Sequence, residues 1–162
     1  MQEKGNGVMI SLEGKNAIVT GGGGGMGRCT ALTLAAAGAN LLVSDVNAEA
    51  AESVAREAVE QYGVKAVAIK CDVTVKSEVD AMVELAVKTF GRIDILNHVA
   101  GVFGAVDFMQ STEADYDKQM NINAKGTYLV DQAVLRIMIP NRAGKIVNMC
   151  SQAGKYGFHT NV

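Results

Sequence analysis

A run of glycines near the N-terminus constrains the fold more than any other stretch of this chain. An apolar segment, 17–19, leads into Thr20, the five glycines 21–25, Met26 and Gly27, and a pattern of small helical residues follows. Each glycine inside a helix or strand costs roughly 0.5–1 kcal/mol relative to alanine, so the run predicts a loop. Such a loop offers backbone N–H groups beside a helix N-terminus, where the helix dipole favours a bound anion such as a pyrophosphate.

The composition narrows the class of partner. The 162 residues suit one domain, and their net charge of -2 argues against a nucleic-acid or anionic-membrane surface and favours small molecules. Cys29, Cys71 and Cys150 are odd in number and widely spaced, so we expect neither a disulfide framework nor a metal site. No segment is apolar enough for a signal peptide or a membrane span. We therefore expect a cytoplasmic protein with an N-terminal tail at 1–14.

Short apolar runs alternate with longer helical patterns along the rest of the chain. The runs are almost continuously apolar, as parallel strands covered on both faces require. The predicted strands are 17–20, 40–44, 66–70, 93–97 and 145–149, and the predicted helices are 26–37, 48–62, 76–90 and 112–139. This alternation predicts an α/β fold of the Rossmann type, a doubly wound parallel sheet with helices on both faces. Ligands of such folds bind at the carboxyl ends of the strands.

Element boundaries are marked by turn and cap residues. Gly38, Gly63 and Gly91 each follow a helical pattern, where a left-handed residue ends a helix. Asn47 and Thr74 precede the second and third helices and are the expected N-caps. The third helix repeats apolar residues at i, i+3, i+4 and i+7, so it should lie flat on the sheet.

Two glycine registers fit the loop. Gly22, Gly24 and Gly27 match Gly-x-Gly-x-x-Gly, whereas Gly21, Gly25 and Gly27 match Gly-x-x-x-Gly-x-Gly. A plain glycine-rich linker is the ordinary alternative. The flanking strand and helix favour a nucleotide loop instead.

Asp45 strengthens the nucleotide interpretation. It ends the second predicted strand about 20 residues beyond the glycines, where a carboxylate accepts hydrogen bonds from an adenosine ribose. Support of the following helix through its dipole is the alternative. A carboxylate there repels the extra phosphate of NADP, Val46 follows it, and the loop has no basic residue, so NAD is the expected cofactor. Arg28 follows the loop and is expected to be solvated.

Four further features follow in an order typical of one family. They are Asp72 after the third strand, the Ala100-Gly101 pair after the fourth, Asn123 in the last helix and the tract 144–154, which contains Ser151. With the glycine loop, they make residues 15–162 resemble a short-chain dehydrogenase/reductase. The resemblance implies that the second glycine register applies and that Asp72 binds the adenine amino group. It implies a cofactor site made of Gly21, Gly25, Met26, Gly27, Asp45, Asp72, Val73, Ala100 and Gly101.

The resemblance also implies an activity. Members of this family transfer a hydride between nicotinamide and a secondary alcohol or ketone while a proton moves at the substrate oxygen. Ser151 would hydrogen-bond that oxygen, and Asn123 would hold a water in the proton relay. Asn123 has an ordinary alternative, which is to satisfy a buried backbone group at a kink. A homo-oligomer built through the long helix is also implied.

The chain departs from the family in two places. His98 and Val99 stand where the family commonly has two asparagines, which leaves the hydrogen bonding of the central strands open. We expect His98 to be a packing residue rather than a base. The second departure concerns the Tyr-x-x-x-Lys pair that the family uses as its acid and base. Four positions after Tyr156 the sequence has Thr160 instead of a lysine. We expect the NAD-binding domain, 15–162, to be the C-terminally incomplete first part of a longer enzyme, inactive alone.

Two other functions fit parts of the pattern. A non-catalytic dinucleotide-binding fragment would use the same glycines and acids without turnover. A methyl transferase with an adenosyl cofactor would use the glycine loop and Asp45 but would leave Asn123 and Ser151 unexplained.

Overall fold

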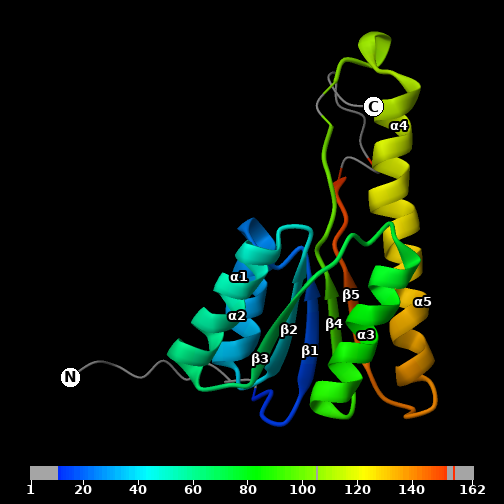
Figure 1. Ribbon diagram of the computed structural model, residues 1–162. Coiled ribbons are helices and arrows are strands. Elements are labelled where there is room, and N and C mark those ends of the chain that lie inside the picture. The colour runs from blue at the N-terminus through cyan, green and yellow to red at the C-terminus, as the bar shows by residue number, and fades with distance from the viewer. Residues whose placement is uncertain (1–10, 105, 153–154, 156–162) are drawn as a thin grey trace.

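A parallel sheet forms the centre of the molecule. The computed structural model describes residues 11–104, 106–152 and 155, and within them five strands pair in the order β3-β2-β1-β4-β5 (Figure 1). The strands are β1 (Asn16–Thr20), β2 (Asn40–Asp45), β3 (Ala66–Lys70), β4 (Ile95–His98) and β5 (Lys145–Asn148). All four strand pairs are parallel, and the chain reverses direction across the sheet at β1 and β4. The predicted doubly wound fold is confirmed.

Helices cover both faces of the sheet. The helical elements are α1 (Gly25–Ala36), α2 (Ala48–Tyr62), α3 (Lys76–Phe90), the 3-10 turn η1 (Phe108–Gln110), α4 (Glu113–Gln119), the π-helical segment η2 (Met120–Lys125) and α5 (Gly126–Met138). Figure 1 shows α1 and α2 on one face, α3 and α5 on the other, and α4 projecting beyond the sheet.

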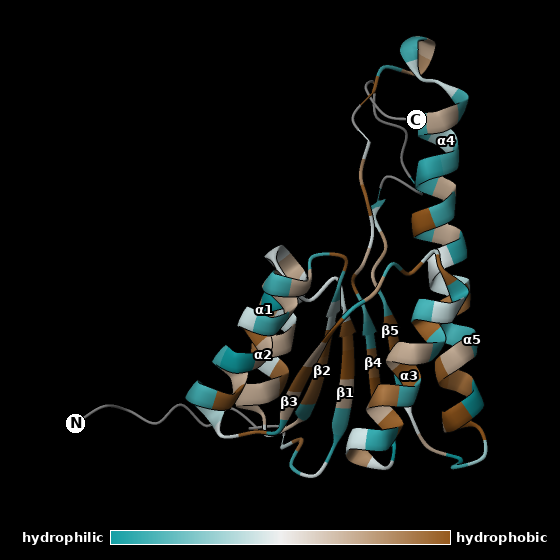
Figure 2. Cartoon of the chain, in the orientation of Figure 1, coloured by the Kyte–Doolittle hydropathy of each residue, from teal (hydrophilic) through white to brown (hydrophobic). Residues whose placement is uncertain are grey.

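Strand alternation builds a separate core on each face. Ile18 and Leu42 pack beneath α3 and α5, whereas their neighbours Val19 and Val43 pack beneath α1 and α2. Successive side chains of a strand point to opposite faces, so a strand covered on both sides is apolar at most of its positions. The central strands are accordingly the most hydrophobic part of the ribbon in Figure 2.

Most predicted helix ends are confirmed. The Asn47 side chain accepts a hydrogen bond from the Ala50 N–H at 3.1 Å and caps α2, and Gly63 and Gly91 end α2 and α3 at φ angles of 68° and 80°. The prediction for Thr74 is wrong, because Val75 is the N-cap of α3. The Thr74 hydroxyl donates instead to the Asp72 carboxylate at 2.8 Å.

The predicted helix over 112–139 is not continuous. Thr112 and Asp115 form a capping box that starts α4, and the hydrogen-bond pattern then changes over Met120–Lys125 into a π-helical segment before α5 begins. Segments of this kind insert extra residues per turn and are frequent at functional sites.

Polar side chains join the amino ends of the strands, opposite the glycine loop. The Asp94 carboxylate accepts from the Asn16 N–H at 3.1 Å and from its side-chain amide at 3.4 Å, and it pairs with Arg92. The Asn40 amide donates to the Asn16 side chain at 3.0 Å and accepts from the Lys65 N–H at 3.1 Å. This set is called the basal ladder below.

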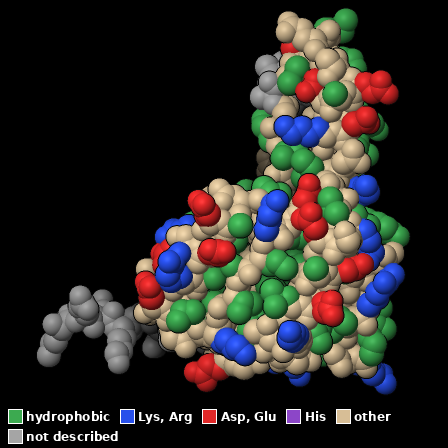
Figure 3. Space-filling model, viewed as in Figure 1, with side chains coloured by type: hydrophobic (Ala, Val, Ile, Leu, Met, Phe, Trp, Pro, Cys, Tyr) green, Lys and Arg blue, Asp and Glu red, His purple; other side chains and the backbone are tan. Residues whose placement is uncertain are grey.

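The outer surface is mixed in charge. Figure 3 shows lysine and arginine side chains interspersed with aspartate and glutamate over the visible face, as the net charge of -2 leads one to expect. Among the residues described, no helix combines the length and apolarity needed to cross a bilayer.

Candidate cofactor-binding and active site

One cavity of about 540 Å³ lies at the carboxyl ends of the strands. The glycine loop after β1, the turn after β2, the turn after β3 and the segment after β4 all contribute to its wall. Eight of the nine predicted cofactor-binding residues line it, namely Gly21, Met26, Gly27, Asp45, Asp72, Val73, Ala100 and Gly101. The ninth, Gly25, is the first residue of α1.

The backbone of the loop requires glycine at the second register's positions. Gly21 and Gly25 have φ angles of 64° and 50°, which side chains rarely adopt. A Cβ on Gly21 would lie 2.8 Å from the Ala100 N and Cα atoms, and one on Gly27 would lie 1.9 Å from the Gly21 carbonyl oxygen. Gly24 has an extended backbone, and a Cβ there would meet nothing within 4 Å. The geometry therefore favours Gly21, Gly25 and Gly27 over the alternative register.

Asp45 holds the loop against the end of β2. One carboxylate oxygen accepts from the Gly23 N–H at 2.9 Å, and the other accepts from the N–H of Asn47, the N-cap of α2, at 3.0 Å. Asp45 lines the cavity, as a ribose-binding residue would, and it also supports the start of α2 through Asn47. Both interpretations of this residue therefore stay open. Arg28 points elsewhere, because its guanidinium donates to both Glu57 carboxylate oxygens on α2 at 2.6 and 2.8 Å.

The turn after β3 fixes the acid predicted to bind adenine. One Asp72 oxygen accepts from the N–H and the hydroxyl of Thr74, both at 2.8 Å, and the Asp72 N–H donates to the Glu78 carboxylate at 2.8 Å. Val73 is buried against the first residue of α5, where a Cβ on Gly126 would lie 2.8 Å from Val73 Cγ2. The turn is therefore rigidly seated between α3 and α5.

Asn123 binds the segment that follows β4. Its side-chain oxygen accepts from the Val102 N–H at 2.8 Å, and its side-chain nitrogen donates to the Val102 carbonyl at 2.9 Å. Gly101 lies beside it, because a Cβ there would be 3.1 Å from the Asn123 oxygen. These contacts satisfy the backbone N–H and carbonyl of Val102 at the π-helical segment, which is the local role that the sequence left open. They also hold Val102 in the far wall of the cavity.

Ser151 follows β5 at the same edge of the sheet. The ladder continues one residue past the strand, since the Met149 N–H donates to the His98 carbonyl at 2.9 Å. Ser151 is exposed two residues further on. Tyr156 and Thr160 lie outside the described residues, as does most of the predicted tail. Of that tail, Leu12 is joined to the end of α1, its N–H donating to the Ala37 carbonyl at 2.7 Å.

His98 fills the place of the missing asparagines. It is 1% exposed, and its Nδ1 lies 2.8 Å from the Thr20 hydroxyl on β1, which also accepts from the Ala100 N–H at 3.3 Å. Burial lowers the pKa of His98, with the Asp131 carboxylate acting in the opposite direction. His98 is thus the predicted packing residue and supplies the link between the central strands.

Several lining residues were missed by sequence reasoning. Val46, Cys71, Val99 and Val102 follow strand ends, where the rule for parallel sheets would have found them. Ile122 comes from the π-helical segment and carries no local signal. Burial raises the pKa of the Cys71 thiol to about 11, with the Ser44 hydroxyl acting in the opposite direction, so Cys71 is an unreactive wall residue.

The segment that follows β4, called the apolar loop below, carries exposed apolar side chains. Phe103, Phe108 and Met109 are 67%, 69% and 87% exposed. Across the described part of the chain, no group of three or more His, Cys, Asp or Glu side chains is arranged to hold a metal ion.

Comparison with known proteins identifies the family. Residues 15–162 match the profile of the family described as short chain dehydrogenase. The chain is 38% identical over 152 residues to 5-keto-D-gluconate 5-reductase of Escherichia coli (strain K12), covering 94% of this chain and 59% of that protein. It is 40% identical over 149 residues to sorbitol dehydrogenase of Cereibacter sphaeroides, covering 91% and 57%.

Solved structures give the same result. An NAD+-bound xylitol dehydrogenase superposes with a TM-score of 0.89 at 38% identity over 93% of this chain and 58% of that one. A 7α-hydroxysteroid dehydrogenase complexed with NADH and 7-oxo glycochenodeoxycholic acid gives 0.88 at 36% identity, with the same coverage. The chain thus spans less than two thirds of the length of these relatives. On the family profile, the fold and the arrangement of the glycine loop, the chain belongs to the short-chain dehydrogenase family.

Proposed function

We propose that this chain binds NAD and belongs to an oxidoreductase that transfers a hydride between nicotinamide and a secondary alcohol or ketone. One observation carries the proposal. The glycine loop, Asp45, Asp72 and the Ala100-Gly101 pair come from four different strand ends and line a single cavity. A linker or a purely structural loop would not need to bring these residues together.

The residues present fit a dinucleotide in a definite direction. The glycine loop and the N-terminus of α1 would hold the pyrophosphate, Asp45 would accept from the adenosine ribose, and Asp72 with Val73 would hold the adenine. The Ala100-Gly101 segment would lie along the path toward the nicotinamide. NAD, when bound, supplies the hydride acceptor.

Ser151 and Asn123 are proposed for the substrate side. Ser151 is exposed at the carboxyl end of the sheet, beyond β5, and would hydrogen-bond the reacting oxygen. Asn123 would position the wall formed by Val102 and take part in the water relay implied by the family. Phe103 and Phe108, which are exposed in the apolar loop that follows β4, would shield the substrate from water.

NAD is proposed rather than NADP. The Asp45 carboxylate lines the cavity, residues 21–27 include no basic residue, and Arg28 is engaged by Glu57. A 2′-phosphate would therefore meet a negative charge without a compensating cation.

Titration with the two reduced cofactors tests the binding proposal. Fluorescence of NADH should increase on adding the chain, and NADPH should need a higher protein concentration for the same effect. Equal or tighter NADPH binding would contradict the assignment of Asp45. Absence of binding to both would contradict the function itself.

A non-catalytic dinucleotide-binding protein is the second candidate. It would use the same cavity residues to hold the dinucleotide without taking part in a reaction. Turnover of secondary alcohols by a chain extended through the codons that follow residue 162 would exclude it, whereas binding without turnover would support it. The family assignment leaves no support for the methyl-transferase alternative.

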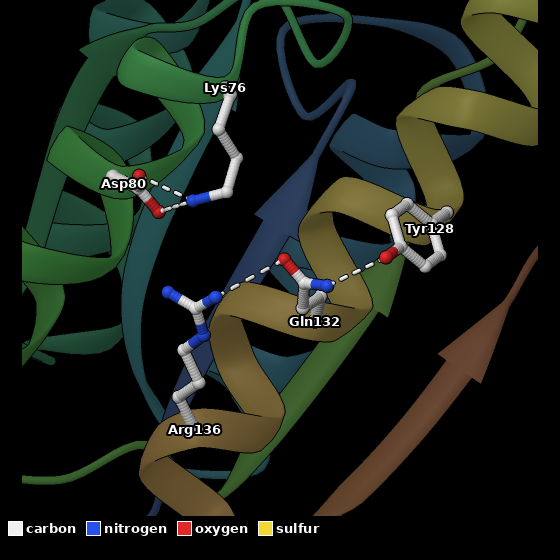
Figure 4. A network of polar contacts seen from close by, with 5 residues as sticks. All are labelled: Lys76, Asp80, Tyr128, Gln132 and Arg136. Atoms are coloured by element: carbon white, nitrogen blue, oxygen red, sulfur yellow. Dashed lines mark hydrogen bonds and ion pairs between the residues drawn. The ribbon is translucent and has the colours of Figure 1, made fainter.

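We also propose a homo-oligomer through the exposed side of α5. Tyr128, Leu135 and Ile139 lie at i, i+7 and i+11 and are 61%, 38% and 66% exposed. Beside them Gln132 donates to the Tyr128 hydroxyl at 2.8 Å and accepts from Arg136 at 3.4 Å (Figure 4). Sedimentation of a Leu135→Glu variant should show a smaller species than the parent chain.

A cytoplasmic location is proposed from Cys29, Cys71 and Cys150, which are free thiols.

A further inference from the structure

A row of polar side chains crosses the carboxyl end of the sheet. The row members are paired across neighbouring strands, and all face the side covered by α3 and α5. They are Ser44, Thr20, His98 and Asn148 on β2, β1, β4 and β5. Asp131 reaches this row from α5, because its carboxylate accepts from the Asn148 side-chain amide at 2.7 Å.

Buried atoms in and beside this row have unmet hydrogen-bonding capacity. Within the described residues, Ser44 Oγ and His98 Nε2 of the row and Asp131 Oδ1 beside it are buried and have no hydrogen-bond partner. His98 and Asn148 are paired across β4 and β5, and Asp131 binds the Asn148 side chain, which places Asp131 on the same face of the sheet as the His98 ring. Buried polar groups are nearly always paired, directly or through an ordered water. His98 Nε2 can donate and Asp131 Oδ1 can only accept, so these two atoms complement each other.

The contacts of Thr20 favour one position of the ring proton. Thr20 is fully buried, its oxygen accepts from the Ala100 N–H at 3.3 Å, and its own hydroxyl proton needs an acceptor, which His98 Nδ1 offers at 2.8 Å. A neutral imidazole that accepts at Nδ1 carries its proton on Nε2. Burial favours the neutral ring, since it lowers the pKa of His98.

We propose that His98 is a positioning residue held as the Nε2–H tautomer, which donates to Asp131 through one buried water. The hydrogen bonds then run in one direction, from Ala100 through Thr20 and His98 to Asp131. This series of hydrogen bonds connects α5 to Ala100. Ala100 in turn abuts Gly21, where a Cβ would lie 2.8 Å from it. The series therefore sets the separation of the two loops that form the cofactor cavity, an effect that rests on the proposed function.

The tautomer is measurable without any cofactor. The chain contains two histidines, His98 and His159, so a long-range 1H–15N correlation spectrum of the 162-residue chain labelled at histidine holds two ring systems. A His159→Gln variant assigns them. The expected His98 pattern is a protonated, pyrrole-like Nε2 and an unprotonated, pyridine-like Nδ1. The reverse pattern, or two protonated nitrogens at neutral pH, would overturn the proposal.

Asp131→Leu tests the link to the cavity. It removes the acceptor, so the His98 signals should shift toward a mixture of tautomers, and the Kd for NADH should rise about fivefold, the effect of roughly one hydrogen bond. Asp117→Leu is the matched control, since Asp117 is an exposed aspartate of α4 and should change neither value. Unchanged His98 signals in Asp131→Leu would exclude the pairing, and an unchanged Kd would exclude the positioning role. A parent chain that fails to bind NADH contradicts the proposed function, while its His98 spectrum still decides the pairing.

Discussion

Gly21 and Ala100 approach each other so closely that a single added carbon would separate them. A Cβ on Gly21 would lie 2.8 Å from both the N and Cα atoms of Ala100, well inside van der Waals contact. Gly21 follows β1 and Ala100 follows β4, so this contact occurs where the chain reverses direction across the sheet. The floor of the cavity therefore consists of two backbones without intervening side chains.

Gly21→Ala should abolish cofactor binding, because alanine at a φ of 64° is strained by about 1–2 kcal/mol and also pushes Ala100 away. The free energy of unfolding should fall by at least about 2 kcal/mol, measured by urea denaturation. Gly24→Ala is the control, since its backbone is extended and the added carbon meets nothing within 4 Å. Equal NADH titrations for the two variants would contradict this account.

Asp45→Ala should weaken NADH binding by about tenfold and bring the Kd values for NADH and NADPH closer together. The variant loses a charge-assisted hydrogen bond, worth about 1.5–3 kcal/mol, and removes the repulsion of a 2′-phosphate. Fluorescence titrations with both cofactors check it. Glu49→Ala, in the first turn of α2 and outside the cavity lining, should behave as the parent chain. An unchanged cofactor ratio in Asp45→Ala would show that selectivity lies elsewhere.

Asp94→Ala should destabilise the chain without affecting the cavity. Asp94 is 7% exposed and accepts two hydrogen bonds from Asn16 in the basal ladder, so its loss should cost about 2 kcal/mol of unfolding free energy. Asp80→Ala, which breaks the exposed pair with Lys76 on α3 (Figure 4), should cost less than about 1 kcal/mol. A larger loss in Asp80→Ala than in Asp94→Ala would reverse this ranking.

Stability should depend on pH through His98. Burial lowers its pKa below the ordinary 6.5, so below that pH the unfolded chain binds a proton that the folded chain does not. The contribution of the neutral His98 ring to the unfolding free energy is therefore complete above about pH 6.5. The unfolding free energy should decrease as the pH falls from there toward about 5. Denaturation at several pH values checks the slope. His98→Asn should flatten it; an equally steep slope in that variant would assign the effect to other groups.

The strands and the ends of α2 and α3 could be predicted because their signals are local. Asn47 caps α2 with its own side chain, and Gly63 adopts the left-handed conformation that the sequence required. Thr74 shows where local reasoning fails. Its hydroxyl could bind either the first N–H groups of α3 or the Asp72 carboxylate. In the structure it donates to the carboxylate.

The break in the long helix depends on tertiary contacts. The predicted helix 112–139 becomes π-helical where Asn123 binds Val102, 21 positions earlier in the chain, and where Gly126 meets Val73. No periodicity within the segment records those partners. The same holds for the missed lining residue Ile122, whose place in the wall follows from this break.

The paired hydrogen bonds between Asn123 and Val102 have a mechanical consequence. They bind Val102, at the start of the apolar loop, to η2 through both its N–H and its carbonyl, as neighbouring β-strands are bound to each other. A loop held in this way cannot slide relative to the helix without breaking both bonds together. Any movement of the segment that follows Val102 would have to hinge beyond this residue, because Val102 itself stays bound to η2 through both hydrogen bonds.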